Sequence, residues 1–231
     1  MSKEFLFEDY KNAEKFKRRY SLDLLNNRYF LDYAKRRLKF RKSIKIEDNI
    51  LEVGSSTGLF SQILLMENKR LKITNLDLSF YFLSFNSIKN RINGDASYLP
   101  IKDDSFDWVF CVDLLHHVDN IEKVVSEMAR VSKKSVIMIE PNMMNPALFL
   151  WAIISKEERG VLRMRKRYLN QIFMKNGLRI SKFEYIEYFP FFLPLLNKMT
   201  AHLFKRIEPL TNLPILNLFS GYHYYELEKN G

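Results

Sequence analysis

The 231-residue sequence has little cysteine and no long uncharged apolar run. Its single cysteine, Cys111, excludes an internal disulfide bond and a cysteine-rich zinc site. No stretch of about 18 uncharged apolar residues occurs, so we predict no transmembrane helix. Charged residues interrupt the apolar positions of the amino terminus, which therefore lacks the layout of a secretory signal. These absences predict a cytoplasmic protein, and no metal site is predicted.

Glycine and proline are also scarce, with seven of each, and neither occurs before Gly54. Residues 1–45 carry 14 Lys or Arg against 6 Asp or Glu, a net charge of +8 out of +10 for the whole chain. Apolar residues recur at helical spacing within residues 8–42, which predicts one or two amphipathic helices. Such a basic face can bind nucleic acid or an anionic membrane, or it can simply be solvated. We favour the solvated face.

Strand and helix patterns alternate after this basic region. The alternation predicts a doubly wound, largely parallel sheet. Expected strands occupy residues 49–53, 71–77, 89–94, 106–115 and 135–142, and expected helices occupy residues 59–68, 79–86 and 121–132.

The pattern changes after Pro141. Asn145 and Pro146 are typical of a helix start, so an apolar helix is expected over residues 145–155. One basic helix is expected over residues 156–177, ended by Gly177. The last strands are expected over residues 178–189 and 221–229. The chain contains no linker, so we expect a single domain over 1–231, with amino-terminal helices (1–45), a ligand-binding core (46–142) and cap inserts with the last two strands (143–231).

The stretch NILEVGSSTGLF, residues 49–60, reads as a strand, a glycine turn and a helix. It matches only one glycine of the dinucleotide fingerprint and lacks the lysine of a phosphate loop. Glu52 stands two residues before Gly54, and a carboxylate there suits a ligand with a positive group. Ser56 takes the place where a further glycine might be expected, and a positive φ would cost it about 1 kcal/mol or more.

Glu52, Gly54 and Gly58 resemble the first motif of class I methyltransferases that use S-adenosylmethionine. Asp77 ends the second expected strand, 23 residues after Gly54, close to the usual spacing of a ribose-binding carboxylate. The resemblance continues in order through Gly94-Asp95-Ala96, Ser105-Phe106-Asp107 and Glu140-Pro141-Asn142. It covers roughly residues 46–142.

The resemblance implies a Rossmann-like, seven-stranded, mostly parallel sheet with an antiparallel last strand, amino-terminal helices and an apolar helical cap. It also implies S-adenosyl-L-methionine as the cofactor. Asp77 would accept hydrogen bonds from the ribose hydroxyls, Asp95 would accept one from the adenine amino group, and Ala96 would offer its backbone N–H. The cofactor-binding residues implied in this way are Glu52, Gly54, Ser55, Ser56, Thr57, Gly58, Asp77, Leu78, Asp95, Ala96, Val112, Asp113 and Leu114.

Several of these residues have a plain structural alternative. Glu52 can be a buried partner of a backbone amide, Asp77 can cap the next helix, and Asp95 can be an ordinary turn residue. His116 and His117 are weak candidates for a catalytic base, and we favour a packing role for both. Methyl transfer is a direct displacement, so placement of the two reactants can supply most of the acceleration without a base.

The methyl acceptor is the least determined part. The apolar segments at residues 147–154 and 188–204 predict a small hydrophobic or lipid-like acceptor, or a peripheral contact with a membrane surface. They can equally be core that covers the sheet. Two other functions stay open: an RNA methyltransferase that uses the basic amino-terminal face, and a relative that binds the cofactor without catalysis.

Overall fold

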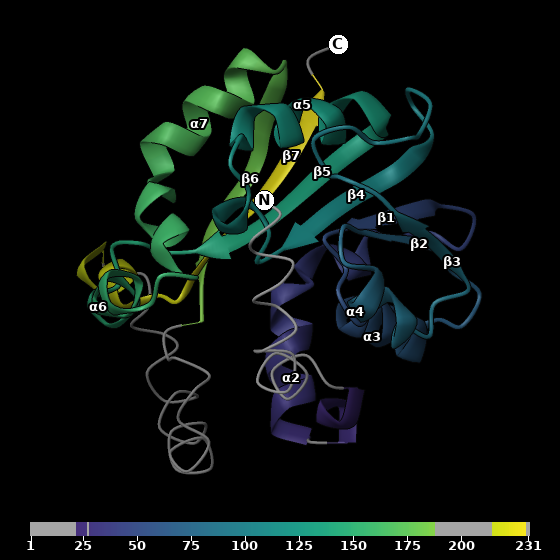
Figure 1. Ribbon diagram of the computed structural model, residues 1–231, viewed down its shortest axis with the longest axis horizontal. Coiled ribbons are helices and arrows are strands. Elements are labelled where there is room, and N and C mark those ends of the chain that lie inside the picture. The colour runs from purple at the N-terminus through teal and green to yellow at the C-terminus, as the bar shows by residue number, and fades with distance from the viewer. Residues whose placement is uncertain (1–21, 27, 188–213, 230–231) are drawn as a thin grey trace.

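Seven strands form one sheet in the computed structural model, which describes residues 22–26, 28–187 and 214–229 (Figure 1). Their order across the sheet is β3-β2-β1-β4-β5-β7-β6. All neighbours pair in parallel except β7, which is antiparallel to both β5 and β6. The strands are β1 (Asn49–Val53), β2 (Lys72–Asp77), β3 (Asn90–Asn93), β4 (Phe106–Val112), β5 (Ser132–Pro141), β6 (Leu178–Ile186) and β7 (Tyr222–Lys229).

This topology confirms the predicted Rossmann-like sheet with an antiparallel last strand. Strands β1 and β4 lie side by side, and the chain winds outward from them in opposite directions. In open α/β sheets, ligands bind at such a switch point, outside the carboxyl ends of the strands. The turns that follow β1, β2, β3 and β4 therefore meet at one edge of the sheet.

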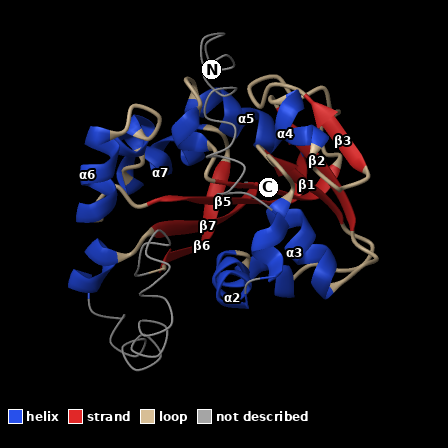
Figure 2. Cartoon of the chain, turned by 60° about the horizontal axis from the view of Figure 1, so that its bottom comes forward, coloured by secondary structure: helices blue, strands red, loops and turns tan. Residues whose placement is uncertain are grey.

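Helices cover both faces of the sheet (Figure 2). Helices α2 (Arg28–Arg37) and α3 (Leu59–Glu67) pack on one face, where alternate strand residues such as Ile50 and Phe110 point. Helices α5 (Ile121–Val131) and α7 (Lys166–Lys175) cover the other face, around residues such as Leu51 and Val109. The remaining helices are η1 (Leu22–Asn26), η2 (Lys39–Lys42), α4 (Phe80–Ser84), η3 (Leu115–His117), α6 (Pro146–Ile154), η4 (Arg159–Arg163) and η6 (Pro214–Phe219).

The amino-terminal prediction is confirmed for residues 22–26, 28–37 and 39–42, which form η1, α2 and η2. Leu24, Leu25, Leu31 and Ala34 pack against the α3 face of the sheet, as their helical spacing requires. Residues 8–21 and the apolar segment 188–204 lie outside the described residues. Among the described helices, none has the length and apolar character needed to cross a membrane.

The single helix predicted over residues 156–177 is wrong, because the structure divides this segment into η4 and α7. The break falls at Met164 and Arg165, where the backbone of Arg165 is extended and caps α7. Within η4, a Cβ at Gly160 would lie 1.6 Å from the carbonyl oxygen of His116, so only glycine allows this close approach to η3. The predicted end of α7 is confirmed: Gly177 follows the helix with a φ of +69°.

The predicted start of the apolar helix α6 is confirmed. The side chain of Asn145 accepts hydrogen bonds from the backbone N–H groups of Ala147 and Leu148, at 3.0 and 3.3 Å, and Pro146 occupies the first turn. Asn145 also donates to the carbonyl oxygens of Phe219 and Ser220. The cap therefore anchors α6 to the segment that leads into β7.

Candidate cofactor-binding site

The turn after β1 has left-handed backbone at three positions. Gly54 and Gly58 have φ values of +73° and +76°, and Ser56 between them has a φ of +49°. A Cβ at Gly54 would lie 2.7 Å from a methyl group of Leu114, which follows β4. The two glycines therefore allow a turn and a close approach that other residues would obstruct. Ser56 therefore has the positive φ that costs a residue other than glycine about 1 kcal/mol or more.

Glu52 is fully buried at the end of β1 and faces helix α3. Its carboxylate accepts hydrogen bonds from the hydroxyl of Ser61 and from the Ser61 backbone N–H at 3.2 Å. Burial is the main cause that raises the pKa of Glu52 to about 8, the Ser61 bonds oppose it, and the charge of Asp77 raises it further. Glu52 thus holds strand β1 to α3, which is the alternative that the sequence left open for it.

Asp77 joins the turn after β1 to the turn after β2. Its two carboxylate oxygens accept hydrogen bonds from the backbone N–H of Ser56 at 2.7 Å and from that of Ser79 at 2.8 Å. Capping of the next helix falls to Ser79, whose side chain accepts from the N–H of Phe82. These two bonds fix the orientation of the Asp77 carboxylate between the turns after β1 and β2.

Asn86 is a residue of this site that sequence reasoning missed. Its side-chain amide donates to the carbonyl oxygen of Ser56 at 3.2 Å and lies 3.4 Å from the Ser55 hydroxyl. A Cβ at Gly58 would lie 2.4 Å from its side-chain oxygen. Asn86 therefore packs directly under the glycine turn, and no spacing rule along the chain pointed to it. Ser55 and Thr57 are both 4% exposed.

The other predicted cofactor residues lie along the same edge. Leu78 directly follows β2, and its carbonyl oxygen accepts from Asn93 at 2.8 Å. Asp95, after β3, is exposed and accepts from the N–H of Ser97 at 2.7 Å, while Ala96 is buried. Val112 is the last residue of β4. These residues therefore stand after the carboxyl ends of neighbouring strands.

Asp113 follows Val112 and is held by a cation from the amino-terminal region. Arg37 of α2 contacts the Asp113 carboxylate at 2.9 Å and the Glu187 carboxylate at 3.0 Å, and all three side chains are at most 7% exposed. The Arg37 guanidinium also lies 3.7 Å from the centre of the Tyr222 ring. Asp113 and Glu187 both have positive φ values, +56° and +59°. Sequence reasoning missed this network because its members are far apart in the chain.

His116 belongs to a second buried cluster, beyond the end of β4. Its Nδ1 lies 2.8 Å from the carboxylate of Glu140, which also accepts from the backbone N–H groups of Leu114 and Leu115. Burial lowers the pKa of His116, but the nearby carboxylates of Glu140 and Glu158 outweigh it and raise that pKa to about 10. A protonated imidazole at neutral pH is a poor base, so this environment argues against His116 as a proton acceptor. The half-buried His117 ring lies 3.9 Å from that of His116, centre to centre.

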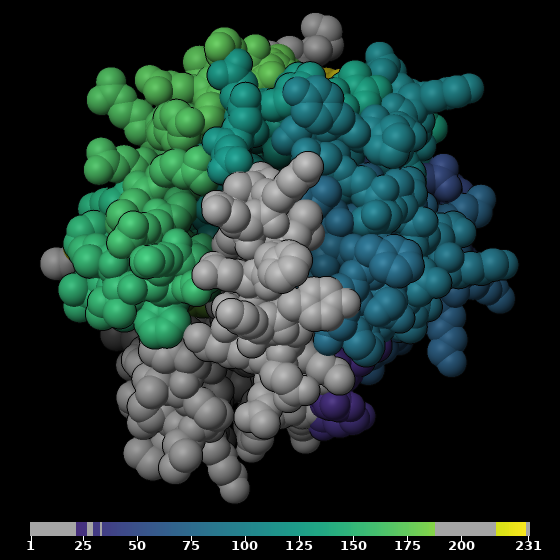
Figure 3. Space-filling model, viewed as in Figure 1, coloured from purple at the N-terminus to yellow at the C-terminus, as the bar shows by residue number. Residues whose placement is uncertain are grey.

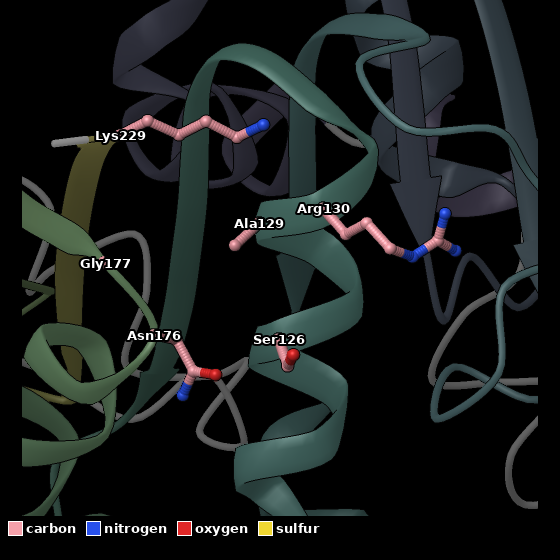
Figure 4. Close-up of a pocket in the computed structure, with 6 residues that line it drawn as sticks. All are labelled: Ser126, Ala129, Arg130, Asn176, Gly177 and Lys229. Carbon is pink, nitrogen blue, oxygen red and sulfur yellow. The ribbon is translucent and has the colours of Figure 1, made fainter. Parts of the chain in front are cut away.

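One surface hollow of 270 Å³ lies elsewhere, among the ends of α5, α7 and β7 (Figure 4). Lys229 lines it, and this residue pairs with Leu178 at the start of β6, so the hollow is at the amino edge of the sheet. Its other lining residues are Ser126, Ala129, Arg130, Asn176 and Gly177. None of them is a predicted cofactor residue, and the motif-bearing edge is the better candidate because ligands bind at the carboxyl ends of the strands.

Two buried polar atoms at the glycine-turn edge support a fit to the predicted cofactor. The hydroxyl of Ser56 and one carboxylate oxygen of Asp113 have no hydrogen-bond partner among the described residues. They belong to the turns after the adjacent strands β1 and β4. Buried acceptors of this kind are normally satisfied, and both suit the amino group of an amino-acid tail.

Residues 51–139 match the family model described as a methyltransferase domain. The chain is 35% identical over 95 residues, 37% of its length, to the phosphatidylethanolamine N-methyltransferase of Cereibacter sphaeroides, and covers 45% of that protein. It is 29% identical over 162 residues, 64% of its length, to the 23S rRNA (cytidine-2'-O)-methyltransferase TlyA of Campylobacter jejuni, and covers 58% of it. The chain thus spans about half the length of these curated relatives.

The fold is also that of solved methyltransferases. A crystal structure of a SAM-dependent methyltransferase from Archaeoglobus fulgidus superposes with a TM-score of 0.65 at 19% identity, covering 99% of this chain and 100% of that one. At this identity the likeness concerns the fold. The shared fold agrees with the strand order of this chain, in which the glycine turn, Asp77 and Asp113 all follow the carboxyl ends of strands.

Proposed function

We propose that this chain, whose residues 51–139 match a methyltransferase domain, transfers a methyl group from S-adenosylmethionine to a small hydrophobic or lipid-like acceptor. S-adenosylmethionine supplies an electrophilic methyl group on a sulfonium that is a good leaving group. The residues of this chain bind and orient the two reactants, and in this proposal residues 1–231 act as a single domain.

In this proposal the carboxyl edge of the sheet holds the cofactor. Asp77 binds the ribose hydroxyls, and its bonds to the turns after β1 and β2 support this role by fixing its carboxylate. The Ser56 hydroxyl and one Asp113 carboxylate oxygen, which have no partner in the described part of the chain, accept from the amino-acid tail. Leu114 packs on Gly54 and so links the turn after β1 to the segment after β4. In this proposal His116 is not the base, because the carboxylates beside it raise its pKa to about 10, and placement of the two reactants can supply most of the acceleration.

The exposed apolar surface of helix α6 is the main support for a hydrophobic or lipid-like acceptor. The helix follows the carboxyl end of β5, all nine of its residues are apolar, and only Ala152 is buried. Scattered exposed apolar residues are ordinary, but a contiguous apolar surface marks an interaction site. Helix α6 lies on one side of the molecule, away from α3 and α4 (Figures 1 and 3). Its exposed large side chains are Phe149, Leu150, Trp151, Ile153 and Ile154.

The basic amino-terminal region gives less support to an RNA acceptor. Several of its cations already contact carboxylates of this chain. Lys35 and Arg41 pair with Glu67, and Lys39 pairs with Glu184. Cations engaged in this way are less available to neutralise phosphates. These cations of the described amino-terminal region therefore form ion pairs within the chain.

A transfer assay with labelled S-adenosylmethionine tests the proposal. The acceptors are a phospholipid with a primary amine in vesicles, a quinol, a water-soluble amine and ribosomal RNA. We expect label on the vesicle lipid or the quinol, and transfer to RNA alone would contradict the acceptor class. Asp77→Ala should weaken cofactor binding at least about tenfold by calorimetry, since two hydroxyl hydrogen bonds are lost. Unchanged affinity would contradict the ribose role.

A pair of variants separates the acceptor surface from the rest of the protein. The double variant Trp151→Ser, Ile154→Ser makes α6 more polar and is expected to raise KM for the lipid or quinol without changing cofactor affinity. The matched control is Met66→Ser on α3, where the side chain is also half exposed, at 50%. An equal rise in KM in both variants would argue that α6 has no special role.

A further inference from the structure

Three side chains with metal-binding atoms converge beyond the end of β4. A ring nitrogen of His116, a ring nitrogen of His117 and a carboxylate oxygen of Glu158 all lie within 4.8 Å of one another. The Nε2 of His116 and Oε2 of Glu158 are 3.6 Å apart, longer than a good hydrogen bond. Two ligands bound at about 2.0–2.1 Å to a tetrahedral zinc ion lie about 3.4 Å apart. The observed separation is therefore close to that of two ligands of one ion.

Glu140 orients the His116 ring for this purpose. Its Oε2 lies 2.8 Å from Nδ1 of His116, which turns Nε2 toward Glu158. Its Oε1 accepts from the backbone N–H groups of Leu114 and Leu115, at 2.9 and 2.7 Å, so the carboxylate is itself fixed. A metal-binding histidine typically donates its other ring N–H to a carboxylate in this way.

The two segments that carry the ligands are held together without the ligand side chains. The guanidinium of Arg163, in η4, donates hydrogen bonds to the carbonyl oxygens of His116 and Val118, at 3.3 and 2.7 Å. Gly160 lies against the carbonyl of His116, where a Cβ would have no space. Glu158, two residues before this contact, is 7% exposed. The cluster is thus built into the contact between η3 and η4.

We propose that His116, His117 and Glu158 bind one zinc ion and leave its fourth coordination position open. Two imidazole nitrogens and one carboxylate oxygen are a zinc donor set, and an open position is typical of sites that also take a small ligand. The three ligand atoms, which lie within 4.8 Å of one another, would move closer together around the ion. The ion replaces the proton on Nε2 of His116, because a ligating nitrogen must be unprotonated. This proposal revises the sequence expectation that no metal site exists, and it does not depend on methyl transfer.

A bound proton is the competing explanation of the same contacts. A protonated His116 between Glu140 and Glu158 is an ordinary buried ion pair that needs no metal. The two explanations differ in one respect. The ion pair gives no saturable zinc site, whereas the proposed site binds one equivalent through Glu158.

Titration of the full chain with zinc sulfate after chelator treatment, followed by calorimetry, tests the proposal. The variants are Glu158→Gln, which keeps the side-chain shape, and His117→Gln at the half-buried position. The matched control is Glu157→Gln, whose carboxylate contacts Ser155. Circular dichroism without zinc shows whether each variant is folded, and Co²⁺ absorption reports a four-coordinate site.

We expect the wild type and Glu157→Gln to bind one equivalent of zinc. Glu158→Gln and His117→Gln should lose more than about a hundredfold in zinc affinity, and Glu140→Gln about 10–100-fold as a residue behind the ligands. No saturable zinc binding by the folded wild type would overturn the proposal. So would equal affinity in Glu157→Gln and a folded Glu158→Gln, because the ion would then be bound elsewhere.

Discussion

Glu52 and Glu140 are both fully buried near the carboxyl ends of parallel strands, yet they have different partners. Glu52 points to the α3 face and accepts from the hydroxyl and N–H of Ser61, nine residues away. Glu140 points to the α5 face and accepts from two backbone N–H groups and from the His116 ring, 24 residues away. The first carboxyl group has neutral donors, and the second faces a cation.

The surroundings extend this difference. The glycine-turn region, which comprises Glu52, Ser55–Gly58, Asp77 and Asn86, is joined mainly by hydrogen bonds to backbone and hydroxyl groups. The β5-end region, which comprises Asp113–His117, Glu140, Glu158, Glu187 and Arg37, is joined by buried ion pairs. Stability should therefore depend on charge balance in the β5-end region and on backbone conformation in the glycine-turn region.

The largest expected effect is the loss of cofactor binding in Gly54→Val. Valine would have to adopt the left-handed φ of +73°, and its Cβ would collide with Leu114. We therefore expect the affinity for the cofactor to fall below detection by calorimetry. Gly177→Val is the control, because Gly177 has a φ of +69° with no atom within 4 Å of a Cβ. It should lose stability but keep affinity. Full affinity in Gly54→Val would contradict the location of the site.

The variant Arg37→Met removes the cation that joins Asp113 to Glu187 in the β5-end region. It leaves Asp113 and Glu187 buried without Arg37, and loss of one partner of a buried pair costs about 3–5 kcal/mol. Urea denaturation measures this loss. The control Arg179→Met removes an exposed pair with Glu228 and should change the free energy of unfolding by at most about 1 kcal/mol. Similar losses in both would remove the contrast between the regions.

Glu52→Gln should change how stability depends on pH. Burial raises the pKa of Glu52 from 4.5 to about 8, so between these values the folded state binds a proton that the unfolded state has released. This group therefore makes stability fall as pH rises, by about 1.4 kcal/mol per pH unit. Denaturation at several pH values should show that Glu52→Gln removes this slope. The exposed control Glu47→Gln should keep it, and an unchanged slope in Glu52→Gln would mean that Glu52 is ionised.

The smallest expected effect is a gain in stability in Ser56→Gly. Glycine relieves the positive φ at this position, and the Ser56 hydroxyl has no partner among the described residues, so we expect a gain of up to about 1 kcal/mol. Thermal unfolding measures it. Ser55→Gly is the control and should lose stability, because the Ser55 hydroxyl is buried beside Asn86. A loss in Ser56→Gly would indicate that the serine stabilises the turn.

The sequence predicted the regular elements better than the contacts between them. Helix α6 begins at its predicted cap because Asn145 and Pro146 act within one turn of chain. The helix predicted over residues 156–177 is broken at Arg165, whose backbone is extended, and the contact of Gly160 with the carbonyl of His116, more than 40 residues away, leaves no signal in the sequence. Asn86 and Glu158 carry no local signal of their roles, so they could not be predicted.

The sequence by itself determined the alternating α/β pattern, and the resemblance of its ordered motifs implied the antiparallel last strand, the carboxyl edge where the motif residues gather and the class of cofactor. These signals depend on short spacings such as Gly54 to Asp77, which act within one or two supersecondary units. Only the tertiary structure decided that Glu52 bonds to Ser61, that Arg37 joins Asp113 to Glu187, and that Glu158 meets His116. These contacts arise when separate helices pack at one edge of the sheet, and side-chain partners across such distances leave no period or spacing in the chain.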